Sequence, residues 1–460
     1  MKTFFFSLVF LVLQIAQAQI KIMTFEEAQQ QTLNVKVLDS LYAVPQKFFE
    51  GNPALYTKDQ RAFVMRINTL SRQIATKKDN VRIWGRFYVS KDGHFDYFLY
   101  QMEGKISTES QSRLLDSLKN YLSAYKFPVK ITVAHSFHQI IQMGVIRTVI
   151  KGKNTIRTLE EAIATTRPDT VKVLALNQLE LDAIPEVIYR FTEMKELNLS
   201  GNELKRANID LARLPKLRHI WLNNNQLTDS SLLISPNKTL KILNLQGNRF
   251  ADIPEAVHRC KKLNSLWLGY NKLTQLNEES FRGLRYLLDL NLYSCELTTL
   301  PKNIVKLRRL EVLDLYYNQL SILPSSLGRM KKLQQLALSN NDLQTLPSLH
   351  RLKRLQTLYI HHNKLTALPS SIRKLKRLRI LDINNNQFST LPSQIGKLRK
   401  VEDLDISNNN LSEVPKELLQ LPRLQKLYLR ANPFSRDAVL LSRSKPIIES
   451  LENKKTDVSY

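Results

Sequence analysis

The sequence is poor in glycine and has almost no cysteine. Its 460 residues include 12 glycines and two cysteines, Cys260 and Cys295. So few glycines leave no glycine-rich phosphate-binding loop, and neither His-Glu-x-x-His nor Gly-x-Ser-x-Gly occurs. Two cysteines cannot form a scaffold of several disulfides, and their spacing matches no zinc motif. We therefore expect no enzyme, no cofactor and no metal site.

Acidic residues are scarce relative to basic ones. The chain has 68 Lys and Arg residues against 41 Asp and Glu residues, which gives a formal net charge of +27. Such a surplus favours anionic partners, but it does not choose among lipopolysaccharide, acidic glycans, nucleic acid and acidic proteins.

Long apolar runs are also nearly absent. After residue 18 no stretch of 18 or more apolar residues occurs, so we expect no transmembrane segment in the mature chain. At the start, Met1-Lys2 is basic, residues 4–15 are apolar, and Ala16-Gln17-Ala18 offers a small-residue cleavage site. This layout predicts a signal peptide over residues 1–18 and a secreted, periplasmic or envelope protein, with a membrane anchor as the alternative.

The sequence does have leucine at a fixed spacing. From Val171 onward the pattern apolar-x-x-Leu-x-Leu-x-x-Asn-x-Leu recurs in steps of 23 residues, with one step of 24 into Leu290 and one of 22 into Leu358. Its twelve anchor positions are Leu174, Leu197, Ile220, Leu243, Leu266, Leu290, Leu313, Leu336, Leu358, Leu381, Leu404 and Leu427. One such turn cannot bury its own leucines, whereas stacked turns share a continuous core. The pattern therefore predicts a solenoid.

Over roughly residues 168–434 the pattern resembles the leucine-rich-repeat family. The second half of many turns, as in residues 300–307, is similar to that family's Leu-Pro-x-x-Ile-x-x-Leu variant. The resemblance implies an α/β solenoid, a right-handed coil with short parallel strands on its concave face. It also implies a non-catalytic recognition scaffold that binds a protein or glycan there. The cysteine-rich caps of extracellular animal members are missing, which favours a secreted bacterial protein.

An asparagine follows the strand position in ten of the twelve turns, from Asn202 to Asn432. A buried amide at this bend can pair with the backbone of neighbouring turns. Leu179 and Cys295 take this place in the first and sixth turns. We interpret Cys295 as a structural substitute, because a thiol is a small, weak donor. A disulfide with Cys260 is not expected, although an oxidising compartment leaves it open.

Residues 19–155 show no repeat and predict a small α+β domain. We expect helices over residues 24–41, 58–76 and 110–125, and a hairpin of strands over residues 81–89 and 94–101 that turns at residues 91–93. Two further strands are expected over residues 129–134 and 145–150.

This β-β-α-β order is similar to the C-terminal domain of TonB-type periplasmic energy transducers. It departs from that family where residues 125–128 read Tyr-Lys-Phe-Pro, because a tryptophan-proline pair is expected there. The resemblance implies envelope coupling. A plain structural spacer is the reading that we favour.

The ends of the solenoid should be closed by caps. Residues 156–170 are expected to form the N-terminal cap, with a short helix over residues 158–163. Residues 171–434 form the repeats, and residues 435–460 the C-terminal cap helix and tail, with the helix over residues 437–451.

Strand alternation sends one set of side chains out of the concave face. The candidate ligand-binding residues there are His219, Trp221, Trp267, Tyr293, Asp314, Tyr316, Tyr359 and His361. Strands lie about 4.8 Å apart, so the two tryptophans, two strands apart, should stand roughly 10 Å apart. The same alternation predicts that His361 and His362 turn to different faces. Exposed aromatics among amides and carboxylates are typical of a protein or glycan interface, and covering of the sheet is the alternative.

Five consecutive turns carry basic residues just before the strand. The candidate anion-binding residues of this basic flank are Lys306, Arg308, Arg309, Arg329, Lys331, Lys332, Arg351, Lys353, Arg354, Lys374, Lys376, Arg377, Lys397, Arg399 and Lys400. They predict contact with an anionic surface polysaccharide or lipopolysaccharide, and a solvated face copied by repeat duplication is the alternative. Aromatic residues are scarce in this stripe, so we expect no nucleic-acid partner.

Overall fold

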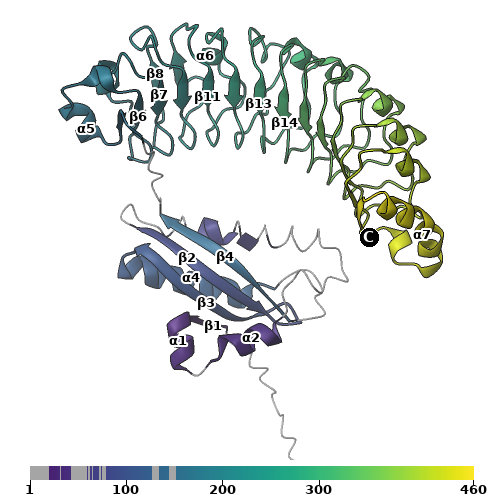
Figure 1. Ribbon diagram of the computed structural model, residues 1–460. Coiled ribbons are helices and arrows are strands. Elements are labelled where there is room, and N and C mark those ends of the chain that lie inside the picture. Colours follow the sequence, from purple (N-terminus) through teal and green to yellow (C-terminus); the bar gives the residue numbers. More distant parts are fainter. Residues whose placement is uncertain are drawn as a thin grey trace, which may run out of the picture. The chain divides into compact units, whose positions relative to one another are not determined.

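The computed structural model describes residues 20–31, 33–42, 60, 63–64, 66–71, 74, 79–126, 134–144 and 152–460. The chain divides into two units, Met1–Ile146 and Arg147–Tyr460 (Figure 1). The expected signal peptide lies outside the described residues. Among the residues that are described, no helix combines the length and the apolar character needed to cross a membrane.

The first unit contains a four-stranded sheet with a helix packed on it. The strands lie in the order β1-β3-β2-β4, and they span Lys21–Thr24 (β1), Asn80–Val89 (β2), Phe95–Lys105 (β3) and His135–Gly144 (β4). β2 runs antiparallel to β3 and β4, and β1 runs parallel to β3. The helix α4 (Thr108–Ala124) buries Leu114, Leu118 and Leu122, which share one helical face because they are four residues apart.

The predicted helix over residues 24–41 is in fact two helices, α1 (Phe25–Gln30) and α2 (Val35–Leu41). Thr24 caps the first by accepting from the backbone N–H of Glu27. Asn34 caps the second by accepting from the N–H of Lys36. Each cap residue has an extended backbone, so the break at Asn34 interrupts the helical pattern.

The sequence analysis was wrong about the last strand of the sheet. It assigned no strand to residues 135–144, which form β4. The two strands expected there fall on residues 129–134 and 145–150, which lie outside the described residues except for Ala134, and Ala134 is not in a strand. Only Phe137, Ile141 and Met143 supply apolar side chains to the core, so the polar residues between them lower the apolar signal of this strand.

The second unit is built on a 14-stranded parallel sheet whose strands pair in sequence order, with β8 and β10 forming a separate pair. The strands are β5 (Thr155–Ile156), β6 (Val173–Ala175), β7 (Glu196–Asn198), β9 (His219–Trp221), β11 (Ile242–Asn244), β12 (Ser265–Trp267), β13 (Asp289–Asn291), β14 (Val312–Asp314), β15 (Gln335–Ala337), β16 (Thr357–Tyr359), β17 (Ile380–Asp382), β18 (Asp403–Asp405), β19 (Lys426–Tyr428) and β20 (Asp457–Ser459). All twelve predicted anchor residues are fully buried and pair in register, as Leu290 does with Leu313. The predicted α/β solenoid is confirmed.

Short helices carry many turns back on the side opposite the sheet (Figure 1). They are η3 (Glu186–Arg190), α6 (Glu255–His258), η4 (Lys302–Lys306), η5 (Ser325–Arg329), η6 (Ser370–Lys374), η7 (Ser393–Lys397) and η8 (Lys416–Gln420). Each of them begins after a proline of the repeat, because proline fixes a backbone angle that suits the first helical turn. β8 (Ala207–Ile209) and β10 (Leu232–Ile234) take the place of helices in two early turns.

Helices lie at both ends of the solenoid, where the sequence predicts caps. η2 (Pro168–Thr170) and α5 (Leu159–Ala164) precede the first full turn, and Thr158 caps α5. After the last turn, η9 (Pro433–Ser435) leads into α7 (Ala438–Asn453). α7 buries Ile448 and Leu451, and β20 extends the sheet by pairing with β19. The apolar ends of the repeat core are therefore covered.

The short turn into Leu358 brings two backbone segments unusually close. None of its residues, all of which are described, forms a 3₁₀ helix between β15 and β16. A Cβ atom added to Gly328, in η5, would overlap the carbonyl oxygen of Ser348. We expect Gly328→Ala to lower the free energy of unfolding by roughly 1–3 kcal/mol, because a backbone oxygen cannot move aside cheaply. Thermal and denaturant unfolding measure this loss. Ser325→Ala, at an exposed position of η5, is the control, and an unchanged midpoint for Gly328→Ala would contradict the expected overlap.

Candidate functional site

The asparagines at the ends of the strands fix the spacing of the turns. Asn318 donates from Nδ2 to the carbonyl oxygens of Leu292 (2.9 Å) and Leu315 (3.0 Å). Its Oδ1 accepts the backbone N–H of Leu297 (3.0 Å). The other asparagines of this ladder make the same kind of contacts, as Asn341 does. The predicted pairing of a buried amide with neighbouring turns is thus present in the structure.

Cys295 replaces asparagine in this ladder. Its Sγ donates to the carbonyl oxygen of Leu268 (3.2 Å), which is the role of an amide donor. The N–H of Leu273 bonds the backbone oxygen of Cys295 instead of a side-chain oxygen. Burial raises the pKa of the Cys295 thiol to about 12, so the thiol stays protonated and unreactive. Both cysteines are buried and free, and Cys260 lies against the carbonyl oxygen of Ala256.

All eight predicted ligand-binding residues lie on the sheet face or directly after a strand, and each is half-buried. Trp221 on β9 and Trp267 on β12 flank Asn244 of β11. Their ring centroids are 5.4 Å apart, closer than the roughly 10 Å that strand spacing predicts. The side chains lean toward each other, because rotamers and not strand spacing set the ring positions.

Carboxylates hold both indole rings in place. Nε1 of Trp221 donates to Oε1 of Glu196 (3.0 Å), and Nε1 of Trp267 donates to Oδ2 of Asp289 (2.6 Å). His219 lies 3.7 Å from the other oxygen of Glu196. Burial raises the pKa of Asp289. The indole N–H groups are therefore satisfied, and the ring faces are left for contact.

A second cluster of aromatic rings continues along the concave face. Tyr293 lies 5.1 Å from Tyr270 and 6.4 Å from Tyr316, measured between ring centroids. Tyr316 in turn lies 5.2 Å from His361, and Tyr359 lies 6.5 Å from it. Together with the tryptophans these rings form an aromatic band. We define this band as Trp221, Trp267, Tyr270, Tyr293, Tyr316, Tyr317, Tyr359, His361 and His362.

The sequence analysis missed Tyr270 and Tyr317, and it was wrong about His362. The rings of His361 and His362 lie 5.4 Å apart instead of on different faces. Tyr270, Tyr317 and His362 have positive φ angles of 57°, 55° and 51°, so the extended backbone that produces alternation has already ended there. Each directly precedes the ladder asparagine, and that position was the signal that could have identified them.

Tyr316, His361 and Asp382 form a hydrogen-bonded chain. The hydroxyl of Tyr316 lies 2.6 Å from Nε2 of His361, and Nδ1 of His361 lies 2.8 Å from Oδ2 of Asp382. With the imidazole proton on Nδ1, His361 donates to Asp382 and accepts from Tyr316. Burial raises the pKa of Tyr316 to about 12, so its hydroxyl remains a donor. This chain fixes the orientation of two rings of the band.

The polar residues beneath the band change from amides to carboxylates along the solenoid. Asn198, Asn244 and Asn291 each accept the backbone N–H of the residue two positions later. In later turns the same bond is accepted by Asp314, Asp382 and Asp405. Burial raises the pKa of both Asp314 and Asp405. The face is therefore neutral at its N-terminal end and acidic towards its C-terminal end.

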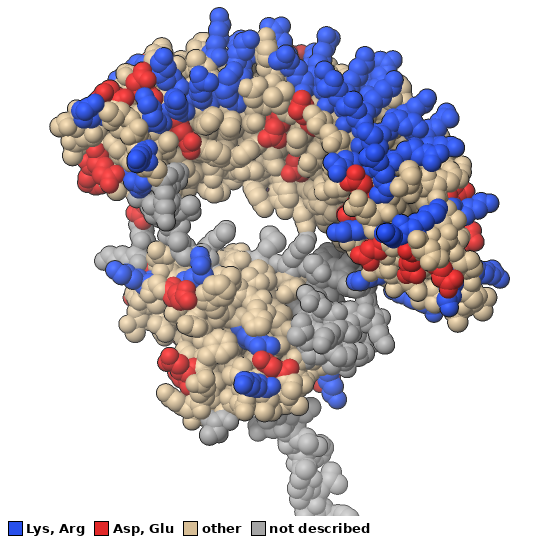
Figure 2. All heavy atoms as spheres, in the orientation of Figure 1, with Lys and Arg blue, Asp and Glu red and all other residues tan. Residues whose placement is uncertain are grey.

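The fifteen residues of the basic flank are all exposed. They directly precede the strands and so lie along the sheet edge where strands begin, and Figure 2 shows Lys and Arg dense over this part of the solenoid. None of the fifteen forms an ion pair with a described residue. Lys376 and Arg399 instead donate to backbone oxygens of the next turn.

An aromatic residue that the sequence analysis overlooked lies beside this flank. Lys262 lies 4.0 Å, Arg309 5.1 Å and Arg285 5.7 Å from the ring centre of Tyr286. A hydrogen bond from Lys262 and the nearby positive charges lower the pKa of Tyr286. The basic surface thus continues for one turn ahead of the predicted columns.

Comparison with known proteins agrees with the fold. A model described as "Leucine-rich repeat region" matches residues 327–453, and one described as "Leucine rich repeat" matches residues 238–297 and 287–343. A probable inactive serine/threonine-protein kinase of Dictyostelium discoideum is 29% identical over 126 residues, which are 27% of this chain. The match covers only 4% of that kinase's length.

Solved structures with this fold come from bacteria and plants. A leucine-rich-repeat protein of Leptospira interrogans is 25% identical and covers 68% of this chain and 100% of its own, with a TM-score of 0.38. An internalin of Listeria monocytogenes is 22% identical and covers 60% and 79%, with a TM-score of 0.48. The ectodomain of a plant receptor kinase from Arabidopsis thaliana, in complex with Casparian strip integrity factor 2, is 22% identical and covers 60% and 48%, with a TM-score of 0.36.

Proposed function

We propose that this leucine-rich-repeat protein is a non-catalytic scaffold of the cell envelope or exterior that recognises a protein partner on its concave face. The observation that carries the proposal is the aromatic band, whose rings are half-buried or exposed and held by hydrogen bonds to carboxylates and to each other. Such rings offer a large contact area and lose little conformational freedom on binding, which is how aromatic hot spots contribute affinity. The envelope location rests on the signal-peptide pattern of residues 1–18.

The test is capture of a partner from the native envelope by the wild-type chain and by the Trp221→Ala/Trp267→Ala variant. We expect the variant to bind the captured partner roughly 30-fold more weakly, because truncation of a central aromatic residue typically costs more than 1 kcal/mol. Quantitative binding of the purified partner measures the loss.

Trp84→Ala is a matched control for this experiment. Trp84 is the third tryptophan of the chain, and it is 42% exposed on β2 of the first unit. Its removal should leave partner affinity unchanged. Unaltered affinity in the double variant would reject the tryptophan pair as the binding site.

A second candidate function is electrostatic binding of an anionic glycan or lipopolysaccharide through the basic flank. It is supported by fifteen exposed cations that have no acidic partner among the described residues. Lysines and arginines stacked in columns create a positive potential that a polyanion can neutralise along its length. Retention on immobilised heparin that ignores salt concentration would reject this function.

For residues 19–155 we propose a separate small domain that acts as a spacer, with TonB-like envelope coupling as the minor alternative. The β2-β3-α4-β4 order supports the resemblance on which the alternative rests. The two readings differ in whether this region alone captures an outer-membrane protein. Only the coupling function requires such a contact.

A further inference from the structure

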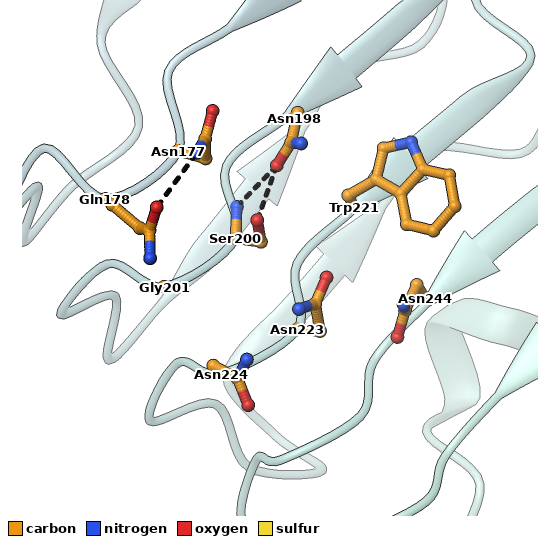
Figure 3. Close-up of a pocket in the computed structure, with 9 residues that line it drawn as sticks. All are labelled: Asn177, Gln178, Asn198, Ser200, Gly201, Trp221, Asn223, Asn224 and Asn244. Carbon is orange, nitrogen blue, oxygen red and sulfur yellow. Dashed lines mark hydrogen bonds between the residues drawn. The ribbon is translucent and has the colours of Figure 1, made fainter. Parts of the chain in front are cut away.

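A polar hollow lies on the concave side of the first turns, ahead of most of the aromatic band (Figure 3). Its volume is ≈ 320 Å³. The residues that line it are Asn177, Gln178, Asn198, Ser200, Gly201, Trp221, Asn223, Asn224 and Asn244. Only Trp221 belongs to the predicted site. No charged side chain is among these residues, so the hollow differs from both the acidic end of the face and the basic flank.

Several amide groups of the hollow keep hydrogen-bonding capacity for a ligand. Oδ1 of Asn198 accepts from the N–H and the hydroxyl of Ser200 at 2.9 and 2.7 Å, which leaves its Nδ2 as a donor. Oδ1 of Asn244 is engaged by the N–H of Gln246 at 3.0 Å, and its Nδ2 is likewise left over. Asn223 lines the hollow with a half-buried side chain. Donors and acceptors therefore alternate over a short distance.

Local backbone geometry builds the floor of the hollow. Asn224 has a positive φ of 56°, which turns its side chain out of the strand pattern. Gly247 on the next turn leaves room for it, because a Cβ atom there would overlap Oδ1 of Asn224. Gly201 closes the other side, also with a positive φ of 66°. The fold thus places amides where a regular strand would not.

Trp221 supplies the single flat apolar wall. Its Nε1 is bonded to Glu196, and its ring also contacts Trp267, so the indole is held from two sides. A sugar ring has an apolar C–H face and a rim of hydroxyls that both donate and accept. An immobilised aromatic face beside several amides, with no charge, is complementary to that combination.

We propose that this hollow binds an uncharged sugar unit of a glycan. An anionic ligand would find no cation in the lining, and a cationic ligand would find no carboxylate. The volume lies at the lower end of small-ligand sites, which suits a sugar unit rather than a long peptide segment. The proposal goes beyond the protein-partner function, and it shares only Trp221 with the aromatic band.

The repeat itself offers a conservative test variant. Asn198→Asp keeps the oxygen that accepts the N–H of Ser200, as Asp314 and Asp405 do for the equivalent N–H in later turns at 3.0 and 2.9 Å. The turn should therefore form normally. The substitution replaces an amide donor in the hollow by a negatively charged acceptor. Asn223→Asp makes the same change at a second position that also lines the hollow.

The experiment measures binding of the purified full chain to an array of neutral, sulfated and sialylated oligosaccharides. Titration with the best neutral oligosaccharide follows. We expect neutral binding that Asn198→Asp and Asn223→Asp each weaken at least tenfold, because a site built to bond hydroxyls loses affinity when a donor is removed. Asp405→Asn, the reverse exchange at the far end of the same column, should bind like wild type.

Further arms separate the sources of the sugar and the two proposals. The same glycan is presented free and on a carrier protein, and binding to both supports recognition of the sugar itself. Binding that survives deglycosylation of the carrier overturns the proposal in favour of a peptide ligand. So does the absence of neutral binding, or neutral binding that both asparagine variants retain. Trp267→Ala lies outside the hollow and should weaken partner capture alone, so failure of one proposal is distinguishable from failure of the other.

Discussion

Replacement of Asn341 by leucine is expected to lower the free energy of unfolding of the solenoid by roughly 3–5 kcal/mol. The buried side chain donates to the carbonyl oxygens of Leu315 (3.0 Å) and Leu338 (2.9 Å) and accepts the N–H of Leu320 (3.0 Å). A leucine would leave these backbone groups without partners at a place that water does not reach. Because each turn contacts only its neighbours, the loss should be greatest in the turns on either side.

Equilibrium denaturation gives the total loss, and amide hydrogen exchange locates it. Gln319→Ala is the control, because this exposed residue follows a ladder asparagine and should change stability by less than about 0.5 kcal/mol. An Asn341→Leu chain that unfolds at the wild-type denaturant concentration would mean that the ladder bonds contribute no net stability.

The sixth turn shows why one ladder position tolerates a different residue. At Cys295 the thiol keeps one donor bond, and the N–H of Leu273 moves to a backbone oxygen. The step into Leu290 is one residue longer than the usual 23, so this turn has additional chain with which to adjust. The turn around Asn341 leads into the shortened step and has no such freedom. We therefore expect asparagine to be needed there.

Leucine spacing made the solenoid predictable, because every anchor packs against an equivalent anchor one turn away. The positions of Leu290 and Leu313 in sequence were enough to place their strands in register. The same argument identified the outward residues of each strand, such as Trp221. It works wherever the backbone is regular, since regular strands fix the direction of each side chain.

The details of the candidate site depend on features that spacing does not encode. The tryptophan rings lean toward each other by rotamer choice, and Tyr270 joins the band because its backbone is left-handed. The polar hollow arises from the neighbouring conformations of Asn224 and Gly247. In the first unit no repeat exists to reinforce a weak pattern, so β4 was missed.

Charge reversal at three adjacent turns of the basic flank should weaken heparin binding by about 100-fold near physiological salt. In Lys331→Glu/Lys353→Glu/Lys376→Glu the net charge falls from +27 to +21, because each substitution removes two charges. Each site changes from attracting to repelling the polyanion, and a surface charge near an anionic surface is worth about 1 kcal/mol. All three side chains are exposed, so the fold should be unaffected. Like charges about 5 Å apart in a column repel by roughly 0.8 kcal/mol in water, so relief of that repulsion should slightly stabilise the chain.

Binding of the unmodified chain should also weaken steeply as salt rises, because the screening length falls from about 10 Å at 0.1 M to about 3 Å at 1 M. The triple variant should show a shallower salt dependence as well as a lower affinity. Lys119→Glu/Lys205→Glu/Lys426→Glu is the matched control, since it removes the same charge from exposed positions outside the flank. Equal weakening by the two triple variants would mean that net charge alone drives the attraction. Wild-type affinity in both would eliminate the flank as an anion site, because an array of unpaired cations cannot bind a polyanion and remain indifferent to reversal of its central charges.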